Sequence, residues 1–353
     1  MHPPRLRAFL PRFLAIAVIA IASPAHAQWW DDADLTFPKF KNLPDYKPKY
    51  TQRSYTNASL TVNSSLQERE FAKVERMYDE FLATKPHSAD GKLLMGGFLE
   101  GLDGVFRSYD EAASKQLLED WEKKLPNSKV LPLAKPIMLQ RQAWKIRGGN
   151  YAGQVPGESM RLFAQKLEAA WKVLGETQDA GRDSPLWYWA ALVVAGSSGA
   201  PPDRMDAIFT EAVKRFPDFL PIYYTRMNYL LPQWGGSFEE VDNFIRESVV
   251  RTERDYGSAF YVWLYLDVVR KNRGDPFQQT ELSWPRMRKG FEDMIARYPD
   301  PFNKNVFATF ACRARDKETT ARLLAELGPS AQLGAWSEGY TTESCRAFAL
   351  AGA

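Results

Sequence analysis

Four predicted helix ends along this chain share one sequence form, in which a cation is followed closely by proline. The prolines lie at steps of about 40 residues or roughly twice that. A cation near the C-terminus of a helix is favoured by the helix dipole, and proline cannot continue the helix. Helical hairpins repeat with this period. The spacing therefore predicts repeated pairs of antiparallel helices whose ends are marked by Pro86, Pro126, Pro217 and Pro299.

One hairpin, from Leu220 to Val250, can be predicted in detail. Its turn has the sequence L-P-Q-W-G-G-S. Proline ends the first helix near Leu231, and the two glycines allow the chain to reverse. A serine followed three residues later by glutamate is a capping box that opens the second helix. The structural residues of this turn are predicted to be Pro232, Trp234, Gly235, Gly236, Ser237 and Glu240.

The same signals place helices along most of the chain, and no segment has the alternation of a strand. The predicted fold is an all-α solenoid or superhelix of stacked hairpins, similar to tetratricopeptide repeats. In two hairpins the first helix, 186–195 or 260–269, is apolar nearly all round. This predicts a tightly wound superhelix, a closed ring, or an inner groove that the N-terminal arm fills. Helices are expected near 66–85, 90–106, 110–124, 129–147, 158–174, 184–196, 202–216, 220–231, 237–251, 257–272, 284–298, 302–314, 317–327 and 341–351.

The N-terminus has the form of a signal peptide. Residues 1–27 hold three arginines, a short apolar run and an Ala-His-Ala site, which predicts cleavage after Ala27 and a periplasmic or secreted protein. The apolar run is shorter than the ~20 residues that span a membrane, so no membrane span is expected after the signal is removed. Residues 28–63, rich in proline and aromatics, are predicted to form an extended arm. Such an arm either stays mobile or docks on the body through its aromatics, and docking is favoured. A single helical domain is expected over 64–353.

Composition narrows the range of functions. The formal charge is +3, and the three arginines of the leader account for it, so the remaining chain is neutral. Nucleic-acid binding, which depends on neutralising phosphates, is therefore not expected. Only His87 remains outside the leader, so neither a His-containing catalytic triad nor a His-rich metal site is predicted. The sequence indicates no cofactor, no metal and no catalytic residue.

The segment from Ala143 to Asp267 contains A-W-K-I-R-G-G-N-Y-A from Ala143, the tryptophans Trp187 and Trp189, and the L-P-x-W-G-G-S turn. Through these motifs, and most specifically through the turn, it resembles a bacterial family of exported proteins of unknown function that is related to tetratricopeptide-type repeats. It implies helical hairpins, and no catalytic residue is carried over from it.

The two cysteines are expected to form a disulfide bond. Cys312 and Cys345 lie about one repeat apart on the last predicted helices, and an exported protein folds in an oxidising compartment. Two buried thiols are the alternative.

Two classes of function are open. The first is a binding or scaffolding module for a peptide or protein partner. The second is a hydrolase or lyase on an (α/α) ring that acts on sugars through two carboxylates, for which Asp267, Glu239 and Glu240 are the candidates. The carboxylate of Asp267 is predicted to pair with Arg226 rather than with Arg270. The candidate groove or contact residues are Arg226, Tyr229, Trp234, Trp263 and Asp267.

Overall fold

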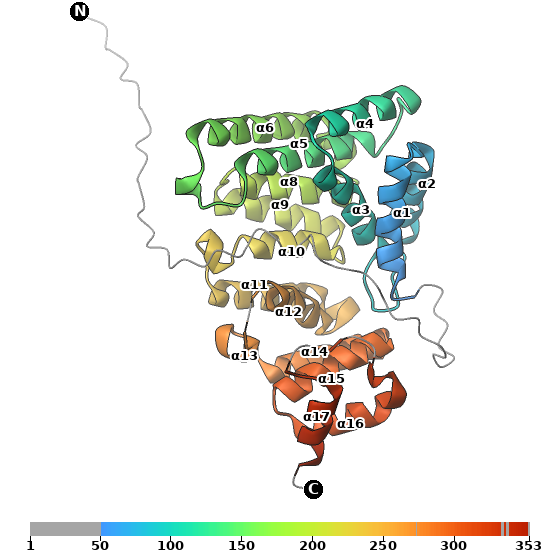
Figure 1. Cartoon of the computed structure of the whole chain (residues 1–353), viewed down its shortest axis with the longest axis vertical. Coiled ribbons are helices and arrows are strands. Elements are labelled where there is room, and N and C mark those ends of the chain that lie inside the picture. Colours follow the sequence, from blue (N-terminus) through green and yellow to red (C-terminus); the bar gives the residue numbers. More distant parts are fainter. Residues whose placement is uncertain (1–50, 273, 333–334, 337–338, 352–353) are drawn as a thin grey trace, which may run out of the picture. The chain divides into compact units, whose positions relative to one another are not determined.

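The computed structural model describes residues 51–272, 274–332, 335–336 and 339–351. Over these residues the chain is all-helical and contains no strand, so the predicted solenoid of antiparallel hairpins is confirmed. Figure 1 shows the helices stacked as sequence-adjacent pairs, with α4, α5 and α6 towards one end and α16 and α17 at the other. Residues 1–50, which include the predicted signal peptide and most of the predicted arm, lie outside the described part.

The longer helices match the expected ranges closely. The helices are α1 Ser54–Gln67, α2 Phe71–Thr84, α3 Leu94–Ser108, α4 Glu111–Lys124, α5 Leu131–Arg147, α6 Gly157–Glu176, α7 Gln178–Gly181, α8 Pro185–Ser197, α9 Pro202–Arg215, α10 Leu220–Asn228, α11 Phe238–Tyr256, α12 Ala259–Lys271, α13 Pro276–Gln279, α14 Trp284–Arg297, α15 Pro301–Arg313, α16 Lys317–Leu327 and α17 Thr342–Leu350. Short 3-10 turns occur at Ala152–Gln154, Pro232–Trp234 and Gly328–Gln332.

The boundary predicted between the arm and the helical domain is wrong. Helix α1 starts at Ser54, inside the range assigned to the arm, and ends at Gln67. The chain breaks at Arg69, which has a positive φ of 62°, and α2 starts two residues later. The prediction failed because α1 is rich in Ser, Thr and Asn, which favour caps and turns over helix interiors.

Helix α1 lies parallel to α3 and very close to it. The glycines of α3 make this approach possible, because a Cβ atom on Gly97 would lie 2.3 Å from the carbonyl oxygen of Tyr55, and one on Gly101 would lie 2.3 Å from that of Ser59. The opposite residues Ala58 and Val62 of α1 are buried against this surface. The pair is therefore a helix contact that only small side chains permit.

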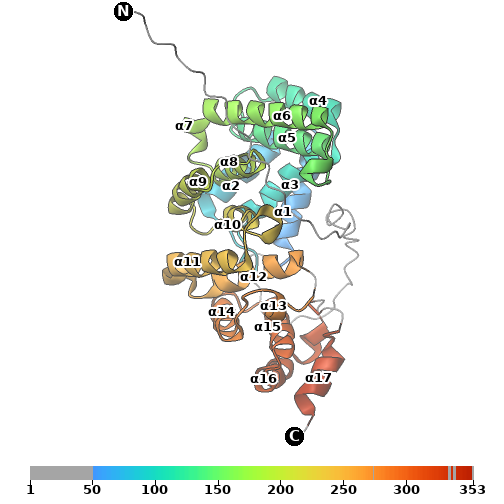
Figure 2. The same cartoon turned by 90° about the vertical axis from the view of Figure 1, so that its left-hand side faces the viewer.

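The superhelix is wound tightly enough for its first hairpin to meet later ones. Both Figure 1 and Figure 2 place α1 and α3 at the level of α8 and α10 rather than at one end of the stack. The loop at 86–93, between α2 and α3, makes the most distant contacts: the ring of His87 stacks on Tyr298 at 5.9 Å, and Asn303 Nδ2 donates to the carbonyl of Asp90 at 3.4 Å. His87 is thus a packing residue of this loop.

The turn after α10 is built largely as predicted. Leu231 is extended ahead of Pro232, Gly235 has a φ of 90°, and the hydroxyl of Ser237 accepts from the amide of Glu240 at 3.1 Å. Helix α10 ends at Asn228, three residues before the expected position. The bond to Ser237 forms one half of the expected capping box.

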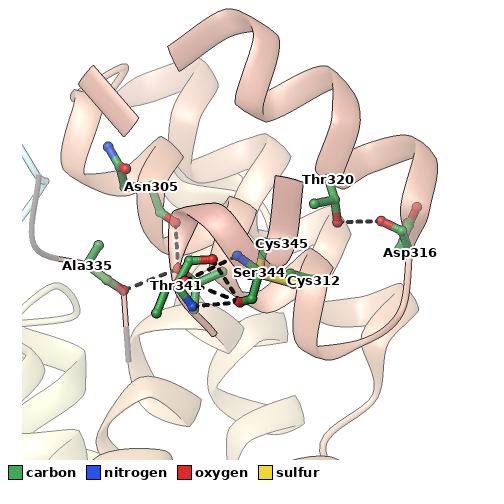
Figure 3. The surroundings of a disulfide bond; sticks show 9 residues. Asn305, Cys312, Asp316, Thr320, Ala335, Thr341, Ser344 and Cys345 are labelled. Atoms are coloured by element: carbon green, nitrogen blue, oxygen red, sulfur yellow. Dashed lines mark hydrogen bonds between the residues drawn. A yellow bond between two sulfur atoms is a disulfide. The ribbon is translucent and has the colours of Figure 1, made fainter. Parts of the chain in front are cut away.

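A disulfide bond joins the last helices. The sulfurs of Cys312 on α15 and Cys345 on α17 are 2.02 Å apart, which is the expected pairing (Figure 3). Cys345 is the buried residue of α17, whose N-terminus is capped by Thr341 and Ser344. The bond therefore anchors a helix that otherwise buries little of its surface.

Candidate functional site

Polar side chains from four helices meet where α1 and α3 face α10 and α12. They are Tyr55 on α1, Glu100 on α3, Tyr224 on α10, and Asp267 and Arg270 on α12, and we call them the inner polar cluster. The charge of Arg270 acts on Tyr55, Glu100 and Tyr224, so the five groups share one neighbourhood. The tight winding of the superhelix brings these distant segments together.

Hydrogen bonds fix part of the cluster. Tyr55 Oη donates to Glu100 Oε1 at 3.0 Å, and Arg270 Nη2 donates to Asp267 Oδ1 at 2.7 Å. Lys271 Nζ lies 2.7 Å from Asp267 Oδ2. No hydrogen bond to the hydroxyl of Tyr224 is found among the described residues, and the Arg270 side chain is 67% exposed. The cluster therefore keeps a guanidinium group accessible to a ligand.

The electrostatic environment of Glu100 is unusual for a carboxyl that solvent reaches. Burial raises the pKa of Glu100. The hydrogen bond from Tyr55 and the charges of Lys92 and Arg270 lower this pKa, but the effect of burial is larger. Burial and the neighbouring Glu100 likewise raise the pKa of Tyr55. Groups with shifted pKa values that lie together are candidates for a functional site.

The predicted ion pair between Asp267 and Arg226 is wrong. Arg226 Nε lies 2.7 Å from Asp206 Oδ1 on α9, while Asp267 pairs with the two cations that follow it on its own helix. Residues three and four positions apart on a helix are neighbours, which favours this local pairing. A buried carboxylate with two cationic partners is well compensated.

The other carboxylates considered for catalysis do not join Asp267. Glu239 and Glu240 lie in the first turn of α11, where their side chains are exposed. Trp263 is only 4% exposed and packs against Tyr256, Phe260 and Tyr298. It is a core residue, in contrast to its predicted place among the groove residues.

Tyr229 and Trp234 do lie together, and Trp144 completes their group, which we call the aromatic corner. The rings of Tyr229 and Trp234 are 5.5 Å apart, and those of Trp144 and Trp234 are 6.1 Å apart at 88°. Trp144 Nε1 donates to Ser197 Oγ at 3.0 Å. Trp234 is 44% exposed, so it does not fill the turn as a buried side chain would.

No protein-family model matches this chain, and no curated protein or solved structure matches it significantly. The resemblance to an exported bacterial family thus stays a prediction. The function has to be inferred from the geometry.

The described residues include no group of three or more His, Cys, Asp or Glu side chains placed to hold a metal ion. Within the same part of the chain, no helix is both long and apolar enough to cross a membrane.

Replacing Trp234 with alanine is expected to lower stability only moderately. We expect a loss of about 1 to 2 kcal/mol, below the ~3 to 5 kcal/mol typical of a buried aromatic, because nearly half of the ring already faces solvent. Thermal melting compares the variant with Trp234→Phe, which keeps a ring at this position. A loss as large as that of a buried aromatic would contradict the observed exposure.

Proposed function

We propose that this chain is an exported binding module whose inner polar cluster receives a segment of a peptide or protein partner. The observation that carries the proposal is the convergence of five polar side chains, of which Glu100 and Arg270 reach solvent. The other three are Tyr55, Tyr224 and Asp267. Helical-hairpin solenoids commonly bind their partners on such inner surfaces. Export is supported by the features of the leader, and the resemblance to an exported family agrees with it.

The chemistry of the cluster fits a peptide. A peptide backbone offers both hydrogen-bond donors and acceptors, and the cluster presents both kinds of group. The guanidinium of Arg270 uses one nitrogen on Asp267, which leaves further N–H donors for a carbonyl or a carboxylate. The hydroxyl of Tyr224 is both a donor and an acceptor.

Site-specific photo-crosslinking tests this function. A photoreactive phenylalanine analogue replaces Tyr224 in the full chain, and the same analogue at the exposed Glu119 on α4 is the control. We expect a discrete crosslinked product from position 224 only, and its loss when Arg270→Gln is added. Arg270→Gln leaves Lys271 beside Asp267, so the fold is expected to persist. Equal products from both positions, or none from position 224, would reject the binding module.

One observation favours hydrolysis of glycosidic bonds as a second candidate. Glu100 has a raised pKa, whereas Asp267 lies beside two cations, and two carboxyls in different environments suit acid and base roles. The test is the release of reducing ends from a panel of oligosaccharides. Turnover that is lost in Glu100→Gln, while the variant stays folded, would support the enzyme. Absence of turnover on every substrate would leave the binding module.

The raised pKa of Glu100 predicts a pH-dependent stability. Its contribution is favourable below the ordinary carboxyl pKa of about 4.3 and is lost as the pH rises through the higher pKa of the folded state. Glu100→Gln removes the titrating carboxyl and is expected to reduce this loss. The melting temperature of the variant should therefore rise relative to that of the unmodified protein as the pH increases. An NMR titration of the side-chain carboxyl checks the direction directly. A midpoint at or below the ordinary value would contradict the prediction.

A further inference from the structure

Trp234 is held in an exposed position by its backbone. It closes the 3-10 turn Pro232–Trp234, and Gly235 follows with a positive φ of 90°. A Cβ atom on Gly236 would lie 2.1 Å from the carbonyl oxygen of Leu230, so the turn is also packed tightly against the end of α10. An indole that a rigid turn keeps partly in solvent is a preorganised contact surface.

Neighbouring rings support Trp234 from the side. Trp144 meets it at 88° and Tyr229 at 56°. Trp144 is itself covered, because the guanidinium of Arg147 lies 4.9 Å from its ring centroid and Phe163 meets it edge-on at 5.4 Å. Trp144 therefore acts as a wall of the aromatic corner, and Trp234 supplies its open surface.

Polar groups border the aromatic corner. Ser197 Oγ lies 3.4 Å from Tyr229 Oη and also accepts from Trp144 Nε1. The charge of Arg141 acts on Tyr229, and Arg141 is bound by both carboxylate oxygens of Asp103. Asp103 is only 5% exposed and its carboxylate holds Arg141, so the polar border that a ligand can reach consists of the half-buried Ser197 and Tyr229.

We infer that the aromatic corner is a binding site for a saccharide. A sugar ring has an apolar face of C–H groups and a rim of hydroxyls, which match the open indole of Trp234 and the hydroxyls of Ser197 and Tyr229 beside it. The inference is separate from the proposed function, since it uses none of the five residues of the inner polar cluster.

Titration with defined oligosaccharides tests the inference. The probes are cellotriose and N-acetylated chitotriose as neutral ligands and trigalacturonate as an acidic one, each followed by calorimetry and saturation-transfer NMR up to about 10 mM. We expect saturable binding of at least one probe. Preference for trigalacturonate would indicate that Arg147 contributes its charge, and preference for a neutral probe would indicate recognition through hydroxyls; both outcomes support a saccharide site.

Variants then locate the site. Trp234→Ala is expected to weaken binding about tenfold or more, because the open indole supplies the apolar surface of the site, while Trp234→Phe retains most of it. Tyr229→Phe, which keeps its ring and loses only the hydroxyl, is expected to weaken binding less. The matched control is Trp171→Ala, a half-buried tryptophan stacked with Arg204 at 4.3 Å outside the corner. The inference is overturned if no probe binds or if Trp234→Ala binds as well as the unmodified chain.

Discussion

The double variant Gly97→Ala, Gly101→Ala is expected to destabilise the protein by about 4 kcal/mol or more. Overpacking typically costs about 1 to 3 kcal/mol per site, and each new Cβ would lie 2.3 Å from a backbone oxygen of α1, which cannot rotate away. Helix α1 must then move off α3 and expose Ala58, Val62 and Leu66. Chemical denaturation measures the loss, and hydrogen exchange is expected to rise first in α1.

Gly175→Ala in α6 is the matched control. A Cβ atom there meets nothing within 4 Å, so the same substitution is expected to be neutral or to stabilise by up to about 1 kcal/mol. Equal losses in the control and in the double variant would show that helix propensity, rather than close packing, decides the result.

Removing the disulfide is expected to cost about 3 to 4 kcal/mol on the chain-entropy model, given a separation of 33 residues between its cysteines. In Cys312→Ala with Cys345→Ala, α17 is expected to detach before the rest of the chain unfolds, since Cys345 is its buried residue. Hydrogen exchange of α17 and the denaturation midpoint are the measurements.

A thiol titration provides the check on this bond. The protein in denaturant is expected to show no reactive thiol before reduction and two afterwards. Two thiols without reductant would mean that the cysteines are unpaired in the native protein, and the expected loss of stability would then not apply.

Local sequence signals predicted most of the fold because most of the fold is local. The helix ends at Pro86, Pro126, Pro217 and Pro299 and the L-P-Q-W-G-G-S turn each act within a few residues, and the helices around them formed near the expected bounds. Helix α1 was missed because its propensity is poor and its stability comes from contact with α3. The glycines of α3 carried a signal for this contact, since a helix interior that holds Gly96, Gly97, Gly101 and Gly104 needs a close neighbour to be stable.

The candidate site was only partly predictable. Asp267 was selected because it lies on an apolar helix, and it does belong to the inner polar cluster. Its companions Tyr55, Glu100 and Tyr224 carry no local pattern, because winding of the superhelix brings them together. Arg226 was assigned to the wrong partner for the same reason. Sequence periodicity shows which face of a helix is buried, but it does not show which helix packs against that face.

The contacts of the loop at 86–93 affect how this chain reaches its native state. A repeat array usually gains structure from any point, because each unit needs only its neighbours. Here Asp90 bonds to Asn303, 213 residues later in the chain. At about 5 to 20 residues per second, ribosomal synthesis of that stretch takes on the order of ten seconds or more. The contact between the loop and Asn303 therefore cannot form until most of the chain has been made. This delay suits a protein that we propose to be exported, because the native structure is completed only late in synthesis.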